Sequence, residues 1–515
     1  MDDGGSARGV EQRLGGRFLG DDRVDPVVGV DGVVRSARRV YLDSGATTLM
    51  SASIYGDITR YLETACANSH THAHRAGRAT TEAIENARDA VGHLVGMDPR
   101  VDSVLFTGNG ATGALNYLAR ALFPPEVRLF LKAHEARRAI DAAAALGGRT
   151  VNRVRDALLR PLVVTTVMEH HSNMLPWIEA VGRENCRFVE SRPDGQLDLD
   201  DLARVLRDDG DRVRVVTVAG VSNVTGVRNP IHEIARAAHA VGAEIVVDAA
   251  QMAAHAAIAL HVAGDDAATI DYVALSGHKM YVPGSRGALV GGLMRSIGAQ
   301  CVGDVGGGMV DSVSIEDYTP KDDVTAREEA GTPNIPGTIA LGLAARMLAQ
   351  IGLDAIERHE AELTQYALSR LAAIPDVRVY GPTWQAHRRA GVIALNVDGV
   401  SHALVAAYLN DAYNVAVRNE CFCAHPYVKR FLGVTAAEQH VYLREMVDGE
   451  RRRVPGMVRA SFGLYSTRDD VDRLCAGLDE ISRERNRLAE VYVSGPSGDY
   501  VRRSQAEVTR LMPIL

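Results

Sequence analysis

The sequence predicts an α/β protein in which a large, mostly parallel sheet is covered by helices and followed by a smaller α+β domain. One observation behind this prediction is the alternation, from about residue 55 to 310, of amphipathic stretches with short runs rich in β-branched residues. A second observation is that nearly all of the polar residues singled out below come directly after one of those runs. In such sheets, ligands bind beyond the carboxyl ends of the strands.

The composition is that of a globular protein. The chain has 515 residues, of which 46% are hydrophobic and 24% are charged, and this length suggests a large domain with one or two smaller attachments. A formal net charge of −8 gives no reason to expect a nucleic acid or an acidic membrane as partner. No apolar run approaches the ~20 residues that cross a bilayer, and the N-terminus lacks the apolar core of a signal peptide. Six widely spread cysteines do not form a disulfide scaffold, so we expect a cytoplasmic protein.

The elements of the large domain can be assigned in order. We expect a flexible arm over residues 1–40, which are rich in Gly and Asp, and the large domain over 41–336. Residues 80–91 have apolar positions at helical spacing. The Ala- and Arg-rich segment 120–160 is expected to be an inserted helical excursion. The predicted strands begin at Ser103, Leu162, Val213, Ile245, Tyr272 and Gly287.

A smaller domain is expected over residues 337–490, and it opens with a long helix from about Gly337. The tail over 491–515 has too little periodicity for an assignment. The other predicted elements of this domain are β-like runs at 377–380 and 392–397 and helices around 404–409 and 471.

A Gly-rich turn predicts an anion site. Gly108-Asn-Gly-Ala-Thr-Gly follows the run that begins at Ser103 and precedes a helical stretch. Small residues leading into a helix direct backbone N–H groups and the positive end of the helix dipole at an anion. The hydroxyl of Thr112 adds a donor. Taken alone, a plain turn explains this pattern equally well.

A lysine and an aspartate each follow a predicted strand. Lys279 ends the motif Ser276-Gly-His-Lys, which follows the run at Tyr272, and Asp248 ends the run that includes Ile245. A lysine in this position can form a Schiff base with an aldehyde, and a buried Asp can keep a pyridinium nitrogen protonated. Pyridoxal 5'-phosphate (PLP) needs both groups from a protein, so the sequence predicts PLP as cofactor. Asp248 in isolation could also be the N-cap of a helix.

Further side chains could contact this cofactor. Gln251 and Asn223 could reach the phenolic oxygen of its ring, and His170 follows a predicted strand and could stack on the ring face. A lone histidine at such a position is more often a structural residue. Candidate donors to the phosphate are Ser276, His278 and Thr332.

Several motifs together resemble the class V aminotransferase superfamily of fold-type I PLP enzymes. The resemblance is greatest to the branch of group II cysteine desulfurases and selenocysteine lyases. The motifs occur in the order of the family and cover roughly residues 40–480. They are Tyr41-Leu-Asp-Ser-Gly-Ala-Thr-Thr, Phe106-Thr-Gly-Asn-Gly-Ala-Thr, Glu169-His-His-Ser-Asn-Met-Leu-Pro-Trp, Ser222-Asn-Val-Thr-Gly, Val247-Asp-Ala-Ala-Gln, Leu275-Ser-Gly-His-Lys-Met-Tyr, Glu329-Ala-Gly-Thr-Pro-Asn-Ile and Arg459-Ala-Ser-Phe-Gly-Leu-Tyr.

The resemblance implies a seven-stranded PLP domain, a small C-terminal domain and a homodimer with each site at the subunit interface. It also implies that Lys279 binds PLP covalently and that His170 stacks on the ring and relays protons. The residues that it implies for the phosphate are Ala111, Thr112, Ser276, His278 and a Thr332 that reaches across from the partner subunit.

Two arginines and a thiol narrow the reaction. Arg is suited to hold a carboxylate through two hydrogen bonds. Arg418 and Arg459 stand at the positions that, in the family that this chain resembles, bind the carboxylate of the amino-acid substrate. Cys423 follows Arg418 by five positions, which is the spacing of the family's catalytic cysteine. It would take sulfur from cysteine as an enzyme persulfide and release alanine. Such a thiol reacts as thiolate, and His425 is near enough in sequence to help. A buried structural cysteine is the alternative.

The chain departs from the family pattern around this thiol. Residues 419–422 replace the usual Gly and two His, and the stretch from Cys423 to Arg459 is longer than the family norm. The segment Cys421-Phe-Cys also resembles that of molybdenum-cofactor sulfurases. No second cysteine pair has the spacing of zinc ligands, so we expect no metal.

The sequence predicts a PLP-dependent cysteine desulfurase with a small amino-acid substrate and a protein or small-molecule sulfur acceptor. The near alternative is a class V aminotransferase, C–S lyase or epimerase of specialised metabolism in which Cys423 is incidental. A different class is a catalytically silent scaffold or sulfur-carrier-binding protein, which the intact Lys279, Asp248 and arginines argue against. The basic insertions over 120–160 and 434–456 could dock an acceptor.

Overall fold

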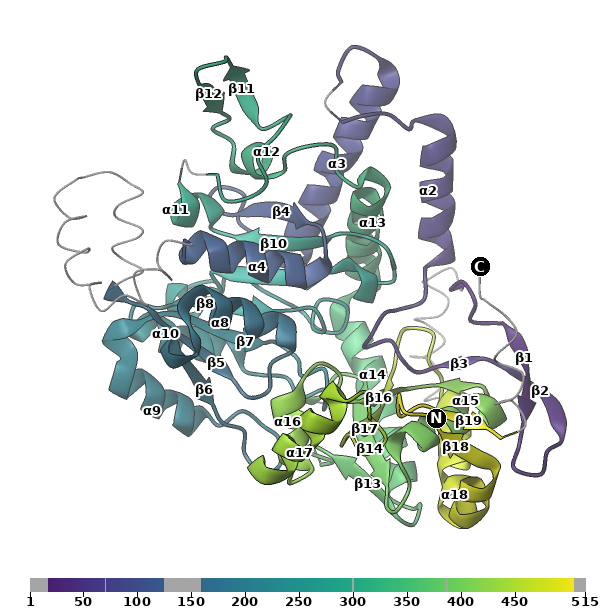
Figure 1. Cartoon of the computed structure of the whole chain (residues 1–515). Coiled ribbons are helices and arrows are strands. Elements are labelled where there is room, and N and C mark those ends of the chain that lie inside the picture. Colours follow the sequence, from purple (N-terminus) through teal and green to yellow (C-terminus); the bar gives the residue numbers. More distant parts are fainter. Residues whose placement is uncertain (1–16, 70, 125–158, 299–300, 385–387, 504–515) are drawn as a thin grey trace.

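The computed structural model describes residues 17–69, 71–124, 159–298, 301–384 and 388–503 (Figure 1). Most of the segment predicted to be an inserted helical excursion, and the ends of the predicted arm and tail, lie outside the described residues.

The large domain is built on a seven-stranded sheet, which confirms the predicted α/β class. The strand order across the sheet is β4 (Ser103–Thr107), β10 (Gly287–Gly291), β9 (Tyr272–Ser276), β8 (Glu244–Asp248), β7 (Val213–Ala219), β5 (Leu162–Thr166) and β6 (Cys186–Val189). The strand β10 is antiparallel to both of its neighbours, β4 and β9, while the pairings from β9 through β6 are parallel.

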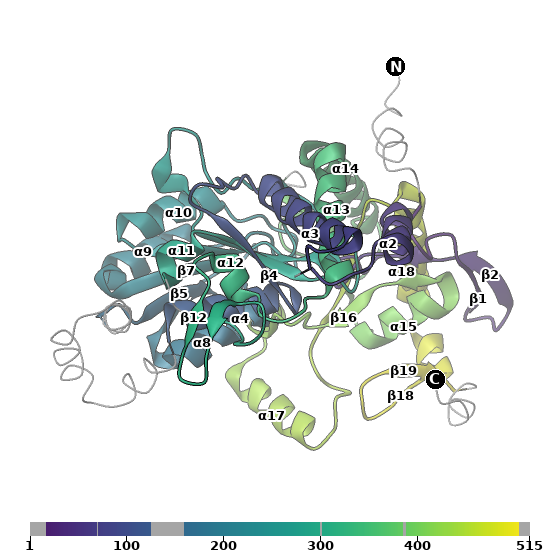
Figure 2. The same cartoon turned by 90° about the horizontal axis from the view of Figure 1, so that it is seen from above.

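Alternating side chains of the strands enter two different cores. Ile245 and Val247 of β8 belong to the core on one face, and Val246 between them belongs to the core on the other. Because side chains alternate along a strand, a run of apolar residues is buried on both faces when helices cover both. The helices on the face of Val246 include α4 (Gly110–Leu122), α8 (Leu175–Val181) and α11 (Leu293–Ile297) (Figure 2). Those on the other face include α3 (Arg75–Leu94), α9 (Leu199–Asp209), α10 (Ile231–Ala240) and α13 (Ile335–Ile351).

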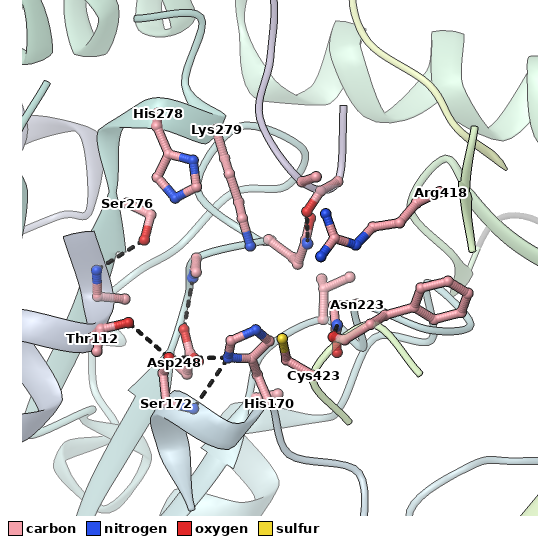
Figure 3. Close-up of a pocket in the computed structure, with 18 of the residues that line it drawn as sticks. Thr112, His170, Ser172, Asn223, Asp248, Ser276, His278, Lys279, Arg418 and Cys423 are labelled. Carbon is pink, nitrogen blue, oxygen red and sulfur yellow. Dashed lines mark hydrogen bonds between the residues drawn. The ribbon is translucent and has the colours of Figure 1, made fainter. Parts of the chain in front are cut away.

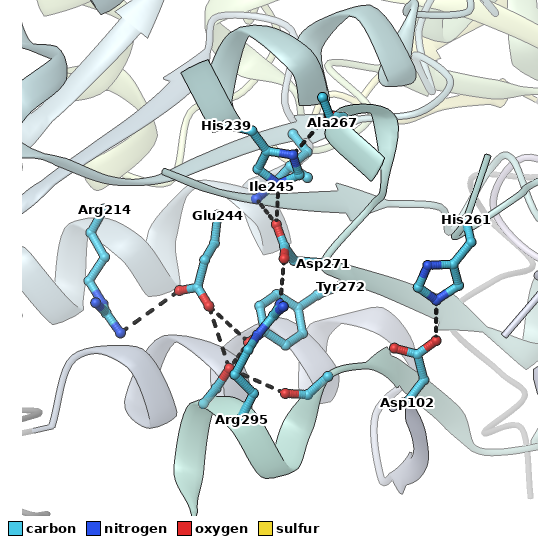
Figure 4. Close-up of polar contacts among 12 residues, drawn as sticks. Asp102, Arg214, His239, Glu244, Ile245, His261, Ala267, Asp271, Tyr272 and Arg295 are labelled. Carbon is cyan, nitrogen blue, oxygen red and sulfur yellow. Dashed lines mark hydrogen bonds and ion pairs between the residues drawn. The ribbon is translucent and has the colours of Figure 1, made fainter. Parts of the chain in front are cut away.

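The amino ends of the central strands are joined by a polar network (Figure 4). Asp271, just before β9, accepts a hydrogen bond of 2.9 Å from the backbone N–H of Ile245 in β8. The same carboxylate contacts His239 at 2.8 Å and forms an ion pair with Arg295. Asp271 therefore links β8 to β9 at the edge of the sheet opposite to the carboxyl ends of these strands.

The small domain packs helices against a four-stranded antiparallel sheet. Its strand order is β13 (Val377–Tyr380), β14 (Val392–Val397), β17 (Met457–Ser461) and β16 (Arg418–Glu420). Its helices are α14 (Leu353–Leu371), α15 (His402–Tyr413), α16 (His425–Phe431), α17 (Ala436–Val447) and α18 (Arg468–Val491). The apolar sides of α14, α15 and α18 form a second core with β14 and β17. The helix α17 lies in the long stretch between Cys423 and Arg459 and buries none of its residues.

The segments around the two domains form short additional elements. Residues 17–40 belong to the predicted flexible arm, yet they contain a hairpin of β1 (Val24–Val28) and β2 (Val34–Arg38). Asn414 holds this hairpin, because its side-chain amide donates to Asp25 and to the carbonyl oxygen of Ala37. The remaining α-helices and strands of the described residues are β3 (Val40–Tyr41), α2 (Ala52–Thr64), β11 (Val310–Val313), β12 (Tyr318–Pro320), α12 (Val324–Glu328), β15 (Val415–Ala416), β18 (Tyr492–Ser494) and β19 (Tyr500–Arg502).

Within the described residues, no single helix is both long and apolar enough to cross a bilayer. The helices α13 and α14 meet that criterion of length and composition only as a pair, across a bend of 76°. No cluster of three or more His, Cys, Asp or Glu side chains in the described part of the chain could hold a metal ion.

Candidate active site

A cavity of about 270 Å³ lies where the carboxyl ends of the central strands meet the small-domain strands β16 and β17 (Figure 3). Except for Thr332, the predicted site residues line this cavity. They are Ala111, Thr112, His170, Asn223, Asp248, Gln251, Ser276, His278, Lys279, Arg418, Cys423 and Arg459.

Lys279 and Asp248 are both buried in the wall of the cavity. Lys279 follows β9 and is 9% exposed, and Asp248 ends β8 and is 5% exposed. Burial lowers the pKa of Lys279 to about 8, against the opposing effect of the Asp248 carboxylate. Burial likewise raises the pKa of Asp248, which accepts one hydrogen bond of 3.0 Å, from the backbone N–H of Ala250. A buried carboxylate with one backbone donor, beside a buried amine, fits the ring nitrogen and aldehyde of PLP.

The Gly-rich turn at the start of α4, named the anion cradle from here on, has the geometry expected of an anion site. The backbone N–H of Ala111 donates to the hydroxyl oxygen of Ser276 at 2.8 Å, which brings the turn against the lysine loop. A Cβ on Gly287 would lie 2.3 Å from the backbone of Gly110, so this close approach requires glycine. His278 also lines the cavity, and burial lowers its pKa to about 4. The helix N-terminus, Ser276 and this histidine fit a phosphate group.

The predicted ring contacts lie around the same cavity. His170 follows β5, and burial lowers its pKa to about 3, so its ring is neutral near pH 7. The side-chain amide of Gln251 donates to the carbonyl oxygen of Gly45 at 2.7 Å, while its own buried oxygen has no hydrogen-bond partner. The side-chain oxygen of Gln251 is therefore available to accept a hydrogen bond from a donor in the cavity. Asn223 donates to the carbonyl oxygen of Phe422 at 2.7 Å.

The two arginines differ in their surroundings. Arg459 is 2% exposed; it donates to the carbonyl oxygen of Asn223 at 3.0 Å and to Asp43 at 3.1 Å. Burial raises the pKa of Asp43, and burial also lowers that of Arg459. The side chain of Arg418 is exposed to the cavity and has no ion-pair partner in the described part of the chain. Arg418 is therefore available to an incoming carboxylate.

Cys423 lies on a tight loop between β16 and α16. Glu420, Phe422 and Cys423 have φ angles of 84°, 51° and 56°, a region that non-glycine residues rarely adopt. Asn223 holds the carbonyl of Phe422, and the backbone N–H of His171 donates to the carbonyl oxygen of Cys423 at 2.7 Å. Such strained backbone is typical of functional loops. The loop directs Cys423 into the cavity, whereas Cys421 is buried and contacts the carbonyl oxygen of Pro455.

Thr332 lies outside this cavity. It is exposed on the loop after α12, where its hydroxyl accepts a hydrogen bond of 3.1 Å from the side-chain amide of Asn68. The expectation for Thr332 concerns a second subunit, and it stays a prediction.

Three residues that contribute to the site were not among the residues predicted from the sequence. Ser172 contacts both Thr112 and His170, Asp43 pairs with Arg459, and the ring of Phe422 lies 5.0 Å from the guanidinium of Arg459. Asp43 and Ser172 lie inside two of the family motifs, and only this location in the sequence could have indicated that they belong to the site.

Comparison with known proteins agrees with this architecture. The family model described as aminotransferase class-V matches residues 40–160 and 158–474. A probable cysteine desulfurase of Halalkalibacterium halodurans is 32% identical over 88% of this chain and 95% of its own length. A cysteine desulfurase of Dickeya dadantii is 33% identical over 86% of this chain and 92% of its own length. The apo structure of a cysteine desulfurase from Thermococcus onnurineus NA1 is similar, with a TM-score of 0.68 and 28% identity over 86% of this chain and 95% of that chain. The resemblance seen in the sequence is thus confirmed, and the chain belongs to the class V aminotransferase family.

Proposed function

We propose that the protein is a PLP-dependent cysteine desulfurase, which removes the sulfur of L-cysteine, holds it as a persulfide on Cys423 and releases L-alanine. The observation that carries the proposal is that one cavity is lined by Lys279, Asp248, two arginines and the thiol of Cys423. The relatives named above as cysteine desulfurases support the same reaction.

The residues of this chain would hold PLP at three points. Lys279 would bind its aldehyde carbon, and Asp248 would pair with its ring nitrogen. His170 would pack on the ring, with Asn223 and Gln251 near the phenolic oxygen. The phosphate would be held by Ala111, Thr112, Ser276 and His278. When bound, PLP supplies an electron sink that stabilises negative charge at the α-carbon of an amino acid.

The basic residues then orient the substrate and move its protons. Arg418 and Arg459 hold the carboxylate of cysteine, which fixes the amino acid in the cavity. With a pKa of about 8, Lys279 is partly unprotonated at neutral pH and can accept the α-proton. Its burial keeps bulk water from competing for that proton.

Cys423 performs the sulfur transfer. Its thiolate attacks the sulfur of the substrate, so that a new S–S bond forms while the carbon–sulfur bond of the substrate breaks. The electron pair of the broken bond stays with the carbon fragment. The fragment becomes alanine by taking one new proton at its β-carbon and regaining at its α-carbon the proton that Lys279 had accepted. The enzyme keeps the sulfur as a persulfide, which a later acceptor removes.

We propose a homodimer, a cytoplasmic location and a protein or small-molecule sulfur acceptor. In support of a second copy, the segment that carries Thr332 also exposes apolar side chains: Val305, Val313 and Ile315 are 67%, 71% and 100% exposed. In support of the cytoplasm, Cys423 must be a reduced thiol to act, and that compartment keeps thiols reduced.

A panel of amino acids, scored for alanine, sulfide and keto acid in the presence of a reductant, tests the proposal. We expect alanine and sulfide from L-cysteine. Cys423→Ser should abolish both products while the absorbance of bound PLP is retained, and Cys421→Ser on the same loop is the matched control that should stay active. Normal turnover by Cys423→Ser would favour the aminotransferase, C–S lyase or epimerase instead.

A further inference from the structure

Ser172 contacts one ring nitrogen of His170 in two ways. It lies in the short turn His171–Asn173 that follows His170. Its backbone N–H donates to Nδ1 of His170 at 3.1 Å, and its hydroxyl oxygen lies 3.0 Å from the same nitrogen. Figure 3 shows both contacts on one edge of the ring.

These contacts determine where the neutral ring carries its proton. A backbone N–H can only donate, so Nδ1 must offer a lone pair to it. Burial lowers the pKa of His170 to about 3, so near pH 7 the ring has a single N–H proton. That proton is therefore on Nε2, which has no hydrogen-bond partner in the described part of the chain.

The hydroxyl of Ser172 extends this arrangement to the anion cradle. Its oxygen lies 2.7 Å from the hydroxyl oxygen of Thr112. Each hydroxyl has one proton to donate, and Nδ1 has none. Every group is satisfied when Thr112 donates to Ser172 and Ser172 donates to Nδ1. If a bound anion accepts the hydrogen bond of the Thr112 hydroxyl instead, Ser172 can still donate to Nδ1.

We propose that Ser172 is a positioning residue that couples the anion cradle at Thr112 to His170 and fixes the His170 proton on Nε2. His170 then presents an N–H to the cavity as a hydrogen-bond donor and has no free lone pair with which to take a proton from a substrate. The coupling part rests on the proposed function, because it assumes that Thr112 contacts the phosphate of PLP. The position of the ring proton does not depend on it.

Nitrogen NMR of protein labelled with ¹⁵N-histidine tests the position of the proton. Signals of His170 are assigned by their loss in His170→Asn. We expect the spectrum of a neutral ring protonated on Nε2, without titration between pH 6 and 9, and a shifted Nδ1 signal in Ser172→Ala that Ser172→Thr restores. A proton on Nδ1 in the unaltered protein, or no change in Ser172→Ala, would overturn the proposal.

A double-mutant cycle tests the coupling. The dissociation constant of PLP is measured for the apo form of the unaltered protein, Thr112→Ala, Ser172→Ala and the double variant. Ser172→Ala should weaken binding by about 2- to 10-fold, the value of one neutral hydrogen bond. The second substitution should add less than it does alone. Strictly additive effects would refute the coupling. If the unaltered protein fails to bind PLP, the proposed function fails instead, and the NMR result stands independently.

Discussion

Arg418 in β16 and Arg459 in β17 stand directly opposite each other in adjacent antiparallel strands, and both line the same cavity. Like charges at directly opposed positions destabilise a sheet. Asp43 forms an ion pair with Arg459 and also attracts Arg418 at longer range, which offsets part of this repulsion. No carboxylate in the described part of the chain forms an ion pair with Arg418 itself. The arrangement favours an anionic ligand, because a carboxylate between the two guanidinium groups removes the repulsion.

Replacing Arg418 should weaken the use of the substrate. We expect Arg418→Gln to lower kcat/KM for L-cysteine by about 10- to 100-fold, since a hydrogen bond to a charged group contributes about 1.5–3 kcal/mol. Arg418→Lys should give an intermediate value, because it keeps the charge without the two-pronged geometry. Arg451→Gln removes a nearby arginine that pairs with Glu420 outside the cavity, and it should have little effect. Equal losses in both Gln variants would show that charge near the site, rather than binding of the carboxylate, is responsible.

The pKa of Lys279 predicts how covalent attachment of PLP depends on pH. With a pKa of about 8, roughly one amine in ten is unprotonated at pH 7. Attachment to the apoprotein, trapped with borohydride, should therefore speed up as pH rises, with a midpoint near pH 8, and level off about one pH unit higher. The carboxylate of Asp248 raises this pKa, so Asp248→Asn should move the midpoint to lower pH.

Mass spectrometry identifies the modified residue with little ambiguity, because the chain has four lysines. Lys279→Ala should abolish trapping, while Lys321→Ala should trap normally. A midpoint near pH 10, the ordinary value for lysine, would contradict the buried environment.

Glu169 predicts a loss of stability as pH rises. It is fully buried and accepts hydrogen bonds of 2.6 Å from Thr166 and from Asn173. Burial raises its pKa to about 7 from the ordinary 4.5, so the folded protein keeps a proton that the unfolded chain has already released. Stability should therefore fall between about pH 4.5 and 7, by on the order of 3 kcal/mol from this group.

Denaturant midpoints at pH 5 and pH 8 measure this effect. The stability of Glu169→Gln should depend less on pH than that of the unaltered protein. Any loss of stability from its altered hydrogen bonds should be the same at both pH values. Glu82→Gln, on the exposed face of α3, should leave the pH dependence unchanged. The same slope in Glu169→Gln as in the unaltered protein would mean that this carboxyl does not titrate on folding.

Because Gly287 lies so close to Gly110, we predict that a side chain at position 287 disturbs the Gly-rich turn, although the two are far apart in the sequence. Gly287→Ala places a methyl group 2.3 Å from backbone that cannot move as a side chain would, so β10 and the turn must separate. We expect a loss of roughly 1–3 kcal/mol in stability and weaker binding of PLP. Gly307→Ala adds the same methyl group in open space and should do neither. Unchanged melting in Gly287→Ala would show that the sheet absorbs the displacement.

The strands of the large sheet could be predicted because their apolar residues are buried on both faces. The six predicted runs all became strands, and the resemblance supplied the number seven. The remaining strand, β6, was missed: its sequence Cys-Arg-Phe-Val lies at the edge of the sheet, where two of its four side chains are half-buried. The hairpin of β1 and β2 was missed for a related reason, because contacts with Asn414, nearly four hundred residues away in the chain, hold it in place.

Most of the cavity could be located because its residues directly follow strands that share one edge. Ser172 could not be singled out in this way, since its importance comes from the turn that brings its N–H and hydroxyl back to His170. Asp43 was missed because it precedes the large sheet and meets Arg459 from the other end of the chain. Thr332 illustrates a different limit: its expected contact belongs to a second subunit, which one chain does not contain.

Hydrogen bonds to the main-chain oxygens of Phe422 and of Cys423 itself hold the loop that carries Cys423. Neither of these hydrogen bonds involves the sulfur atom of Cys423. A single codon change at position 423 could thus swap the reactive group while the loop keeps its shape. The same scaffold could in this way diverge toward reactions that need no thiol, which makes this position a natural starting point for redesign.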